Sequence, residues 1–465
     1  MYSGESFHTA SLRRAPQGDS ITRILAAAIN ALEPGAAVAR HVHRTGDNLD
    51  VTGRVYSLAG FRHVRLLGIG KAASAMSARL GGILGNRLDA GLVITKQAAA
   101  IPGFPFTVLA GGHPVPDAHS LAAGQKTLEF ISDLGPADLL FCLISGGGSA
   151  LAAAPLEGVS LEDLQSLTAA LLACGARIDE INLLRRRLDR IKGGGLVRLS
   201  NGASIVSLIL SDVVGNLLEA IASGPTAPDP SRRADALALL KKYGLRDKIP
   251  ASILAVLEQV PETPKAGDPI FVKVQNVIVG SGLLAAQAAL VQARTEGFNP
   301  YLLRIDLQGE ARQAAFELAT FLRQAKQTGD PVPPPACIVA GGETTVTLRQ
   351  VSPVPAVLAQ AGQAPRGQGK GGRNTELALA AVTELVDFPG VMLVTLATDG
   401  EDGPTDAAGA VATGETYRRA LGMNLHAENF LSRNDSYSYF AALDDLLKPG
   451  PTGTNANDLV FLFVL

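Results

Sequence analysis

The stretch that most constrains the fold is an apolar run that ends in a glycine-rich turn. Residues 139–144 read LLFCLI without a charge, and residues 145–149 read SGGGS. An uncharged run of this length is typical of a strand buried on both faces, as in the middle of a parallel sheet. Glycines after such a strand let a ligand approach backbone N–H groups, and serines add hydroxyl groups. The pattern indicates a phosphate-binding loop in an α/β fold, with a tight turn that binds nothing as the alternative.

Expected strands and helices alternate along the chain, which predicts βαβ units and parallel sheets. The expected strands are residues 64–67, 90–95, 106–109, 139–144, 204–210, 274–279, 301–307, 336–340, 391–397 and 458–465. The expected helices are residues 21–32, 72–80, 120–134, 160–174, 178–188, 283–294, 310–327 and 377–386. The last strand is expected to join the second sheet.

A polar, proline-rich stretch at residues 261–269 (PETPKAGDP) predicts a domain boundary. We therefore expect three parts: an N-terminal tail at residues 1–20, an N-terminal domain at 21–260 and a C-terminal α/β domain at 261–465. The run PVPPP at residues 331–335 is an alternative boundary, but an apolar strand follows it directly.

Composition excludes several classes of protein. The 465 residues are 47% hydrophobic and 18% charged, with a formal net charge of −2, which suits a globular protein of about two or three domains and gives no basic surface for nucleic acid or membrane lipid. Cys142, Cys174 and Cys337 are too far apart for a disulfide framework or a CxxC site, so we expect a reducing, cytoplasmic location. The uncharged run at residues 139–156 is interrupted by glycines and Pro155, which argues against a membrane span.

A second glycine-rich turn follows the first expected strand. Residues 68–73 read GIGKAA and fit the dinucleotide fingerprint G-x-G-x-x-A, with Asp89 near the expected distance. Residues 279–285 (VGSGLLA) fit it too, so the pattern alone is weak. Lys71 distinguishes the first match, because a lysine at a helix start faces an unfavourable dipole unless an anion is present. We expect a phosphate or carboxylate there, with a solvated lysine as the alternative.

Two further loops carry charge suited to phosphate chemistry. Residues 367–376 read GQGKGGRNTE, where Lys370, Arg373 and backbone N–H groups could converge on phosphate, although the loop is not a P-loop and a basic linker is the alternative. Residues 398–406 read TDGEDGPTD, and a cluster of carboxylates after a buried strand suits Mg²⁺. Asp212 and Glu343 are single carboxylates in similar positions. Together these loops favour phosphoryl transfer.

At these residues the chain resembles the glycerate 2-kinase family of the MOFRL type, from about residue 21 to residue 465. The motifs that carry the resemblance are GIGKAA, GGHPVPD, LISGGGSALAAAP, IKGGGL, LILSDVVG, IASGPT, GGETTVT, GKGGRNTE, ATDGEDGPTDAAGA, NDSY and GPTGTNANDL. The resemblance implies an ATP- and Mg²⁺-dependent kinase that phosphorylates D-glycerate at O2. It also implies a Rossmann-like N-terminal domain, a smaller C-terminal α/β domain and a site in the cleft between them.

The resemblance places roles on Lys71 and Arg373, and the chemistry of the loops suggests the other site residues. The important lysine and arginine of the family fall on Lys71 and Arg373, which we expect to neutralise the transferred phosphoryl group. Asp212 and Asp399 are the expected metal ligands. The expected substrate- and nucleotide-binding residues are Gly70, Ser145, Gly146, Gly147, Gly148, Ser149, Lys192, Lys370, Asn374 and Glu376. Two positions depart from the family: Asn216 replaces an aspartate after SDVVG, and Asp189 replaces a common serine.

Two other functions remain open on the sequence. A hydroxypyruvate reductase would use NAD(P)H bound at Gly68, Gly70 and Asp89, but it would leave the basic and acidic loops without a role. A module that only senses sugar phosphates would bind ligand without turnover. The residues do not decide between phosphorylation at O2 and O3, and the expected assembly is a monomer or a homodimer without nucleic-acid or membrane partners.

Overall fold

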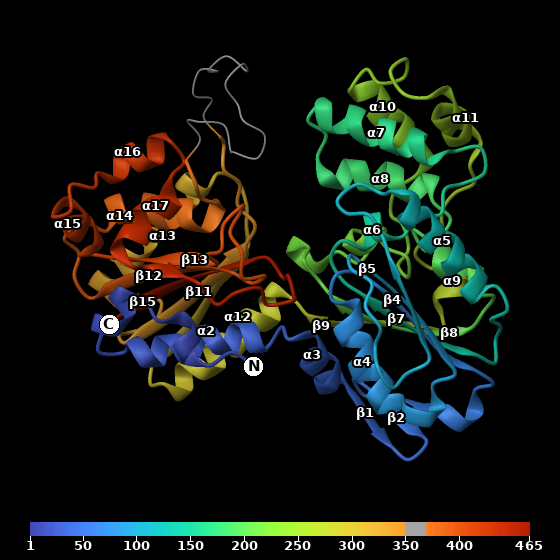
Figure 1. Cartoon of the computed structure of the whole chain (residues 1–465), viewed down its shortest axis with the longest axis horizontal. Helices are drawn as coiled ribbons and strands as arrows, with labels where there is room; N and C mark the ends of the chain where they lie inside the picture. The colour runs from blue at the N-terminus through green and yellow to red at the C-terminus, as the bar shows by residue number, and fades with distance from the viewer. Residues whose placement is uncertain (349–368) are drawn as a thin grey trace. The chain divides into compact units, whose positions relative to one another are not determined.

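The computed structural model describes residues 1–348 and 369–465, which form two compact units (Figure 1). Unit 1 comprises Met1–Glu33 and Ser281–Leu465, and unit 2 comprises Pro34–Gly280. The chain therefore divides after residues 33 and 280, not after the predicted residues 20 and 260. The two units are described separately below.

Unit 2 is built on a parallel sheet of six strands in the order β6-β5-β4-β7-β8-β9. The strands are β4 (Val64–Ile69), β5 (Ala90–Thr95), β6 (Phe106–Ala110), β7 (Leu139–Ile144), β8 (Ser204–Leu210) and β9 (Val274–Gly280). The chain starts in the middle with β4, adds β5 and β6 on one side, and then returns to place β7 on the other side of β4. This is the doubly wound Rossmann order, so the predicted Rossmann-like parallel sheet is confirmed.

The two faces of this sheet bury alternate residues of its strands. Leu66 packs on the face covered by α3 (Pro34–His41) and α4 (Ala73–Leu84). Leu67 packs on the other face, covered by α5 (Ala118–Ile131), α6 (Gly148–Leu151) and α9 (Gly195–Leu199). Successive strand residues point to opposite faces, so the uncharged run of β7, which is buried throughout, contributes to both cores.

A helical cluster and a small antiparallel sheet complete unit 2. The helices are α7 (Leu161–Ala173), α8 (Ile178–Leu188), α10 (Arg233–Lys242) and α11 (Ala251–Gln259), whose apolar faces share one core. The small sheet consists of β1 (Val42–Thr45), β2 (Asn48–Val51) and β3 (Arg54–Ser57). The sequence did not predict α10, α11 or the small sheet, since the small strands are short and mostly polar.

Unit 1 is built on a mixed sheet of six strands in the order β10-β11-β15-β12-β13-β14. The strands are β10 (Asn299–Leu307), β11 (Ala336–Gly342), β12 (Val391–Ala397), β13 (Gly409–Thr413), β14 (Leu446–Leu447) and β15 (Asp458–Val464). Only β10 and β11 pair in parallel. The last strand of the chain, β15, lies between β11 and β12, which confirms that it joins the second sheet.

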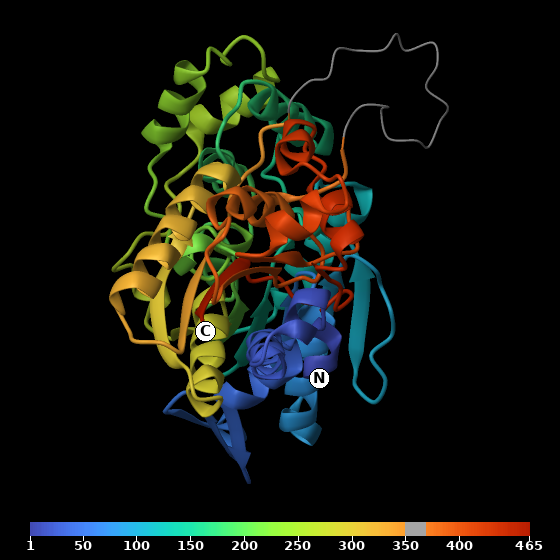
Figure 2. The same ribbon diagram turned by 90° about the vertical axis from the view of Figure 1, so that its left-hand side faces the viewer.

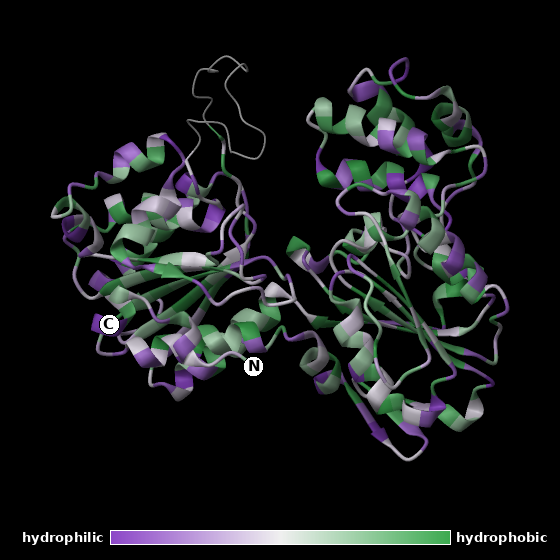
Figure 3. Cartoon of the chain, in the orientation of Figure 1, coloured by the Kyte–Doolittle hydropathy of each residue, from purple (hydrophilic) through white to green (hydrophobic). Residues whose placement is uncertain are grey.

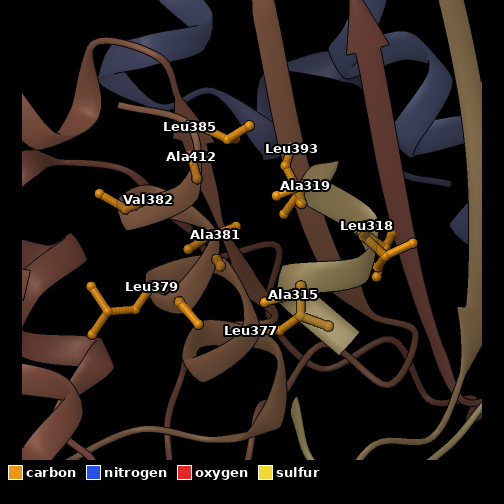
Figure 4. Packing of buried hydrophobic residues seen from close by; sticks show 14 of the residues in the cluster. Ala315, Leu318, Ala319, Leu377, Leu379, Ala381, Val382, Leu385, Leu393 and Ala412 are labelled. Carbon is orange, nitrogen blue, oxygen red and sulfur yellow. The ribbon is translucent and has the colours of Figure 1, made fainter. Parts of the chain in front are cut away.

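Helices cover both faces of the sheet in unit 1 (Figure 1). Its helices are α1 (Ala10–Arg14), α2 (Gly18–Asn30), α12 (Gly282–Thr295), α13 (Ala311–Thr328), α14 (Arg373–Glu384), α15 (Thr416–Leu421), α16 (Ala427–Ser432) and α17 (Ser436–Leu443). Figure 4 shows Leu318 of α13 and Leu377 of α14 among the side chains that pack with Leu393 of β12. On the opposite face, α1, α2 and α12 bury a second core against the same strands.

The N-terminal segment and β9 explain why the boundaries differ from the prediction. Phe7 and Leu12 are buried in the core that α2 and α12 share, so residues 1–20 are not a tail. Figures 1 and 2 both show the blue N-terminal helices against unit 1. The strand β9 completes the sheet of unit 2, which places the proline-rich stretch 261–269 inside that unit.

Hydropathy follows this layered arrangement. Figure 3 shows hydrophobic colouring along the strands of both sheets and mixed colouring on the helices, as expected for helices that bury one face. No single helix within residues 1–348 and 369–465 is long and apolar enough to cross a membrane. The helices α2 and α3 meet that criterion only when they are counted together.

We expect Leu25→Ala to destabilise unit 1, because Leu25 is 0% exposed in the core between α2 and the sheet. Truncating a buried leucine costs about 2–5 kcal/mol. Urea titration followed by hydrogen exchange of α2 and α12 measures the change. Val291→Ala is the control, since Val291 is 70% exposed on α12 and its loss should cost less than about 0.5 kcal/mol. Equal stabilities for the two variants would contradict the docking of the N-terminal segment.

Candidate functional site

The strands β4 and β7 form the point where the strand order of unit 2 reverses. Ile69 at the end of β4 pairs with Ile144 at the end of β7. After β4 the chain continues to β5 on one side of this pair, and after β7 it continues to β8 on the other side. Doubly wound sheets bind their ligands beyond the carboxyl ends of the strands at such a point. The two glycine-rich turns predicted from the sequence, at residues 68–73 and 145–149, both lie there.

Backbone hydrogen bonds tie these two turns together. The N–H of Ser145 donates to the carbonyl of Ile69 (3.0 Å), and the N–H of Lys71 donates to the carbonyl of Gly146 (3.0 Å). The hydroxyl of Ser145 accepts from the N–H of Ala72 (3.0 Å). At Gly70, where φ is +138°, a Cβ atom would lie 2.2 Å from Oγ of Ser145, so only glycine fits. Ser145 and Gly70 therefore hold the turns in place.

Three charged or titratable side chains lie close to Gly146 and Gly147. A Cβ atom on Gly146 would lie 2.2 Å from Oδ2 of Asp212, and one on Gly147 would lie 3.0 Å from Cδ2 of His113 and 3.4 Å from Cε of Lys71. Among the residues that the structure describes, the N–H groups of Gly146 and Gly147 donate to no other group. Free N–H groups next to a lysine make an anion-binding turn. We call Lys71, His113, Gly146, Gly147 and Asp212 the switch-point site.

The remaining predicted residues of the 145–149 loop support this turn. Gly148 and Ser149 begin the short helix α6, and Oγ of Ser149 lies 2.8 Å from Oγ of Ser223. A Cβ atom on Gly148 would lie 2.9 Å from Cβ of Ala222, so this glycine permits close packing of the following turn. Lys71 itself is exposed just before α4 begins.

Lys192 lies in the core of unit 2, in an ion pair. Its ammonium group is 5% exposed and bonds to the carboxylate of Asp189 and, at 3.0 Å, to the carbonyl of Ala152. Asp189 also accepts from the N–H groups of Ala154 and Ile191, each at 3.0 Å. Asp189, which departs from the family pattern, thus neutralises the positive charge of Lys192, the lysine predicted to bind phosphate.

Arg373 is the first residue of α14 and lies beside the ends of the strands β11, β12 and β15 in unit 1. Two carboxylates bind it there. Its Nε and Nη2 bond to Asp458, and its Nη1 bonds to Glu343 at 2.9 Å. Asp458 pairs with both Gly342 and Ala397 in the sheet, so the loops after β11 and β12 meet beside it. Burial raises the pKa of Asp458 to about 6. Burial acts to lower the pKa of Arg373, but Asp458 and Glu343 outweigh it and raise that pKa.

The other predicted residues of the 367–376 loop stabilise unit 1. The N–H groups of Asn374 and Thr375 donate to the buried carboxylate of Asp402 (2.9 and 2.8 Å), which caps α14. Glu376 is 1% exposed and paired with Arg312 of α13. These contacts leave little of Glu376 or Asp402 available for a ligand. The predicted positions Gly367 and Gln368 lie outside the described residues.

Lys370 differs from its neighbours because it is exposed. Its ammonium lies 3.7 Å from the ring centroid of Tyr437, in a cation–π contact, and its N–H donates to Asp435 at 2.9 Å. Its side chain is therefore accessible, unlike those of Asn374 and Glu376.

The predicted magnesium ligands come from both units. Asp212 belongs to unit 2 and Asp399 to unit 1. In the acidic loop, Asp402 caps α14 and Asp406 accepts from Tyr437 (2.6 Å) and Lys448 (3.1 Å). In the described part of the chain, no group of three or more His, Cys, Asp or Glu side chains is arranged to hold a metal ion. Asp212 alone still suits Mg²⁺ bound mainly by substrate phosphates, which needs only one or two carboxylates.

Asp89 does not fit the role of ribose-binding acid in a dinucleotide site. Its carboxylate accepts from the N–H of Val64 at 2.7 Å, at the start of β4, whereas Gly70 follows the end of that strand. Six residues of strand separate the two ends by about 20 Å. The position after β5 that an acid would occupy holds Lys96. The prediction for Asp89 is wrong because sequence distance does not show which end of the sheet a residue occupies.

The sequence missed two residues that the structure brings to these sites, His113 and Asp458, while Glu343 had been noted as a single carboxylate without a partner. His113, in the GGHPVPD stretch after β6, lies at the switch-point turn, and Glu343 and Asp458 bind Arg373. The signal for His113 was a histidine in a glycine- and proline-rich loop at the end of a strand of the parallel sheet. Nothing in the sequence links Asp458 to Arg373.

Comparison with known proteins identifies the family of the chain. Residues 20–258 match a family described as a domain of unknown function, DUF4147, and residues 336–458 match the MOFRL family. The glycerate 2-kinase of Pyrococcus horikoshii is 37% identical over 447 residues, covering 95% of this chain and 96% of that protein. The chain belongs to the glycerate 2-kinase family of the MOFRL type.

Two further relatives bear on the alternatives. The crystal structure of a glycerate kinase from Thermotoga maritima matches with a TM-score of 0.81 at 36% identity, covering 95% of this chain and 98% of that one. A relative from Agrobacterium vitis with the provisional name hydroxypyruvate reductase is 39% identical, covering 85% of each chain. Relatives of this chain therefore carry both names.

If Lys192 stabilises the core of this family member, Asp189→Ala should lower the free energy of unfolding by about 3–5 kcal/mol, because it leaves a buried ammonium without its partner. Chemical denaturation measures the change. The double variant Asp189→Ala/Lys192→Met should recover part of the loss, since no buried charge remains. If Asp189→Ala is as stable as the parent protein, Lys192 has no structural role of this kind.

Proposed function

We propose that this chain is a D-glycerate 2-kinase, which transfers the γ-phosphoryl group of ATP to O2 of D-glycerate and yields 2-phosphoglycerate and ADP. Membership of the glycerate 2-kinase family supports the reaction. The observation in the structure that carries the proposal is the switch-point turn, where the free N–H groups of Gly146 and Gly147 lie beside Lys71. Phosphoryl transfer depends mainly on positioning and charge neutralisation, which such a turn supplies.

The residues of unit 2 would divide the work between binding and neutralisation. The N–H groups of Gly146 and Gly147 would hold phosphate oxygens, and the exposed ammonium of Lys71 would approach the γ-phosphoryl group. Asp212, next to Gly146, would supply one carboxylate to Mg²⁺, which neutralises charge on the phosphates when it is bound. Gly70 and Ser145 keep the two turns at a fixed separation.

The role of Arg373 rests on the family resemblance more than on its geometry. Two carboxylates bind its guanidinium, so a phosphoryl oxygen would compete with Glu343 for Nη1. We propose the same kind of role for the exposed Lys370. Asp399 is half-buried after β12 and is retained as a second metal-ligand proposal in unit 1.

Location and assembly are further parts of the proposal. The three cysteines are free, and Cys142 and Cys337 are buried, which suits a reducing cytoplasm. We propose that the enzyme acts there as a monomer or a homodimer on small molecules alone. The nearly balanced charge supports the absence of nucleic-acid and membrane partners.

The function is tested by incubating the purified protein with ATP, Mg²⁺ and D-glycerate. We expect ADP and 2-phosphoglycerate in equal amounts, with the phosphate position identified by ³¹P and ¹³C NMR. Formation of 3-phosphoglycerate would contradict the assignment of O2. Oxidation of NADH on addition of hydroxypyruvate, without kinase turnover, would favour the reductase instead. Binding of substrate without either reaction would favour a sensing module.

In the same assay, Lys71→Met should lower kcat/KM by roughly 10²–10³-fold, since it removes one group that stabilises the charge of the transition state. Thermal unfolding should not change, because Lys71 is exposed. The matched control is Arg79→Met, which removes an exposed cation from α4 and should leave kcat/KM within about twofold. Full activity of Lys71→Met would exclude this lysine from the reaction.

A further inference from the structure

His113 is held in a rigid loop that begins where β6 ends. The N–H of Gly111 donates to the carbonyl of Thr95 (3.0 Å), and a Cβ atom on Gly111 would lie 2.1 Å from the carbonyl oxygen of Leu151. On the other side, the carboxylate of Asp117 accepts from the N–H of Gly112 (3.1 Å) and caps α5. The loop is therefore pinned before and after the histidine, so the position of its ring is preorganised.

The imidazole ring of His113 lies against the switch-point turn. A Cβ atom on Gly147 would lie 3.0 Å from Cδ2 and 3.3 Å from Nε2 of the ring, and 3.4 Å from Cε of Lys71. The ring and the lysine therefore flank the same glycine, whose N–H is free to bind a phosphate oxygen. A group that lies beside bound phosphate is well placed to meet the hydroxyl that attacks it.

The ring of His113 is half-buried and still reaches solvent. Its pKa is affected by burial and by two lysines, with no hydrogen bond among the causes. A ring that reaches solvent is accessible to a substrate.

The surroundings of His113 favour the neutral ring. Burial lowers its pKa below the ordinary value, and the positive charges of Lys71 and Lys96 lower it further. Lys71 follows β4 and Lys96 follows β5, while the turn after β7 brings no charge of its own against the ring. Asp117 on the same loop is bound to Gly112 and Ser120, and Asp212 lies at the neighbouring Gly146. At neutral pH the ring therefore carries a free lone pair.

We propose that His113 is the general base of the kinase, accepting the proton of the glycerate O2 hydroxyl as that oxygen attacks the γ-phosphorus. This rests on the proposed kinase function. In the step, the O2–H bond breaks and an N–H bond forms on His113. A bond forms between O2 and the γ-phosphorus while the bond from phosphorus to the β–γ bridging oxygen breaks, and its electron pair leaves with ADP. The imidazolium then releases its proton to water.

The cationic neighbours suit this cycle. Lys71 and Lys96 make the imidazolium unfavourable, so they promote proton release after each turnover. The same lysine that neutralises the phosphoryl group thereby keeps the base unprotonated. The competing base is Asp212, a carboxylate at the same turn, and the experiment separates the two.

The test compares His113→Gln with His119→Gln, which changes an exposed histidine on the same stretch of chain. We expect His113→Gln to lower kcat by 10²–10⁴-fold, the range for loss of a general base, with KM for ATP changed less than about twofold. The control should keep the parent kcat. In the parent enzyme kcat should fall as the pH drops below the pKa of His113, because the protonated ring cannot accept a proton. This acid limb should be absent from the residual activity of His113→Gln.

Three results would overturn the proposal. They are a kcat for His113→Gln within about threefold of the parent, an acid limb that persists in the variant and so points to Asp212, and an NMR titration of the parent protein that shows His113 protonated at pH 7. The NMR titration does not need a folded variant, and His113→Asn provides a second substitution. Absence of turnover by the parent protein contradicts the kinase function itself, which distinguishes that failure from an error about His113.

Discussion

The hydrogen bonds between the turns that follow β4 and β7 are the constraint on which unit 2 depends. They join Ser145 to Ile69 and Lys71 to Gly146 through the backbone, so the two turns cannot move apart independently. Because Gly70, Gly146 and Gly147 have no side chains, Ser145, Asp212, His113 and Lys71 can come close around this point. A Cβ atom at Gly70 or Gly146 would overlap these groups. Packing therefore requires glycine at both positions.

The sequence predicted the buried strands well and the short elements poorly. Residues 139–144, 204–210 and 391–397 were expected as strands and match β7, β8 and β12 residue for residue, because a strand buried on both faces forms a nearly continuous apolar run. The strands β1 to β3 have four residues each with exposed positions, so their composition resembles that of a loop. Domain limits were misplaced because proline-rich composition marks surface loops inside a unit as readily as linkers between units.

The charged residues of the site were harder to interpret than the glycines. Lys192 and Glu376 have the side-chain chemistry of ligand-binding residues, but Asp189 and Arg312 neutralise them inside the protein. Arg312 lies 64 residues from Glu376 in the sequence, so no local pattern could indicate the pair. His113 was missed because its neighbours come from loops that follow other strands. Only the order of the strands in the sheet brings these loops together.

Unit 1 is assembled from two segments, residues 1–33 and 281–465, that are separated by the whole of unit 2. The helices α1 and α2 are translated before unit 2, yet their apolar faces are covered by α12 and by strands that are translated after it. Unit 2 is continuous and can complete its sheet while the rest is still being translated. Until α12 and those strands are translated, the three isoleucines and the one leucine of α2 lack their packing partners, and β15 pairs with β11 and β12 only after both have been made.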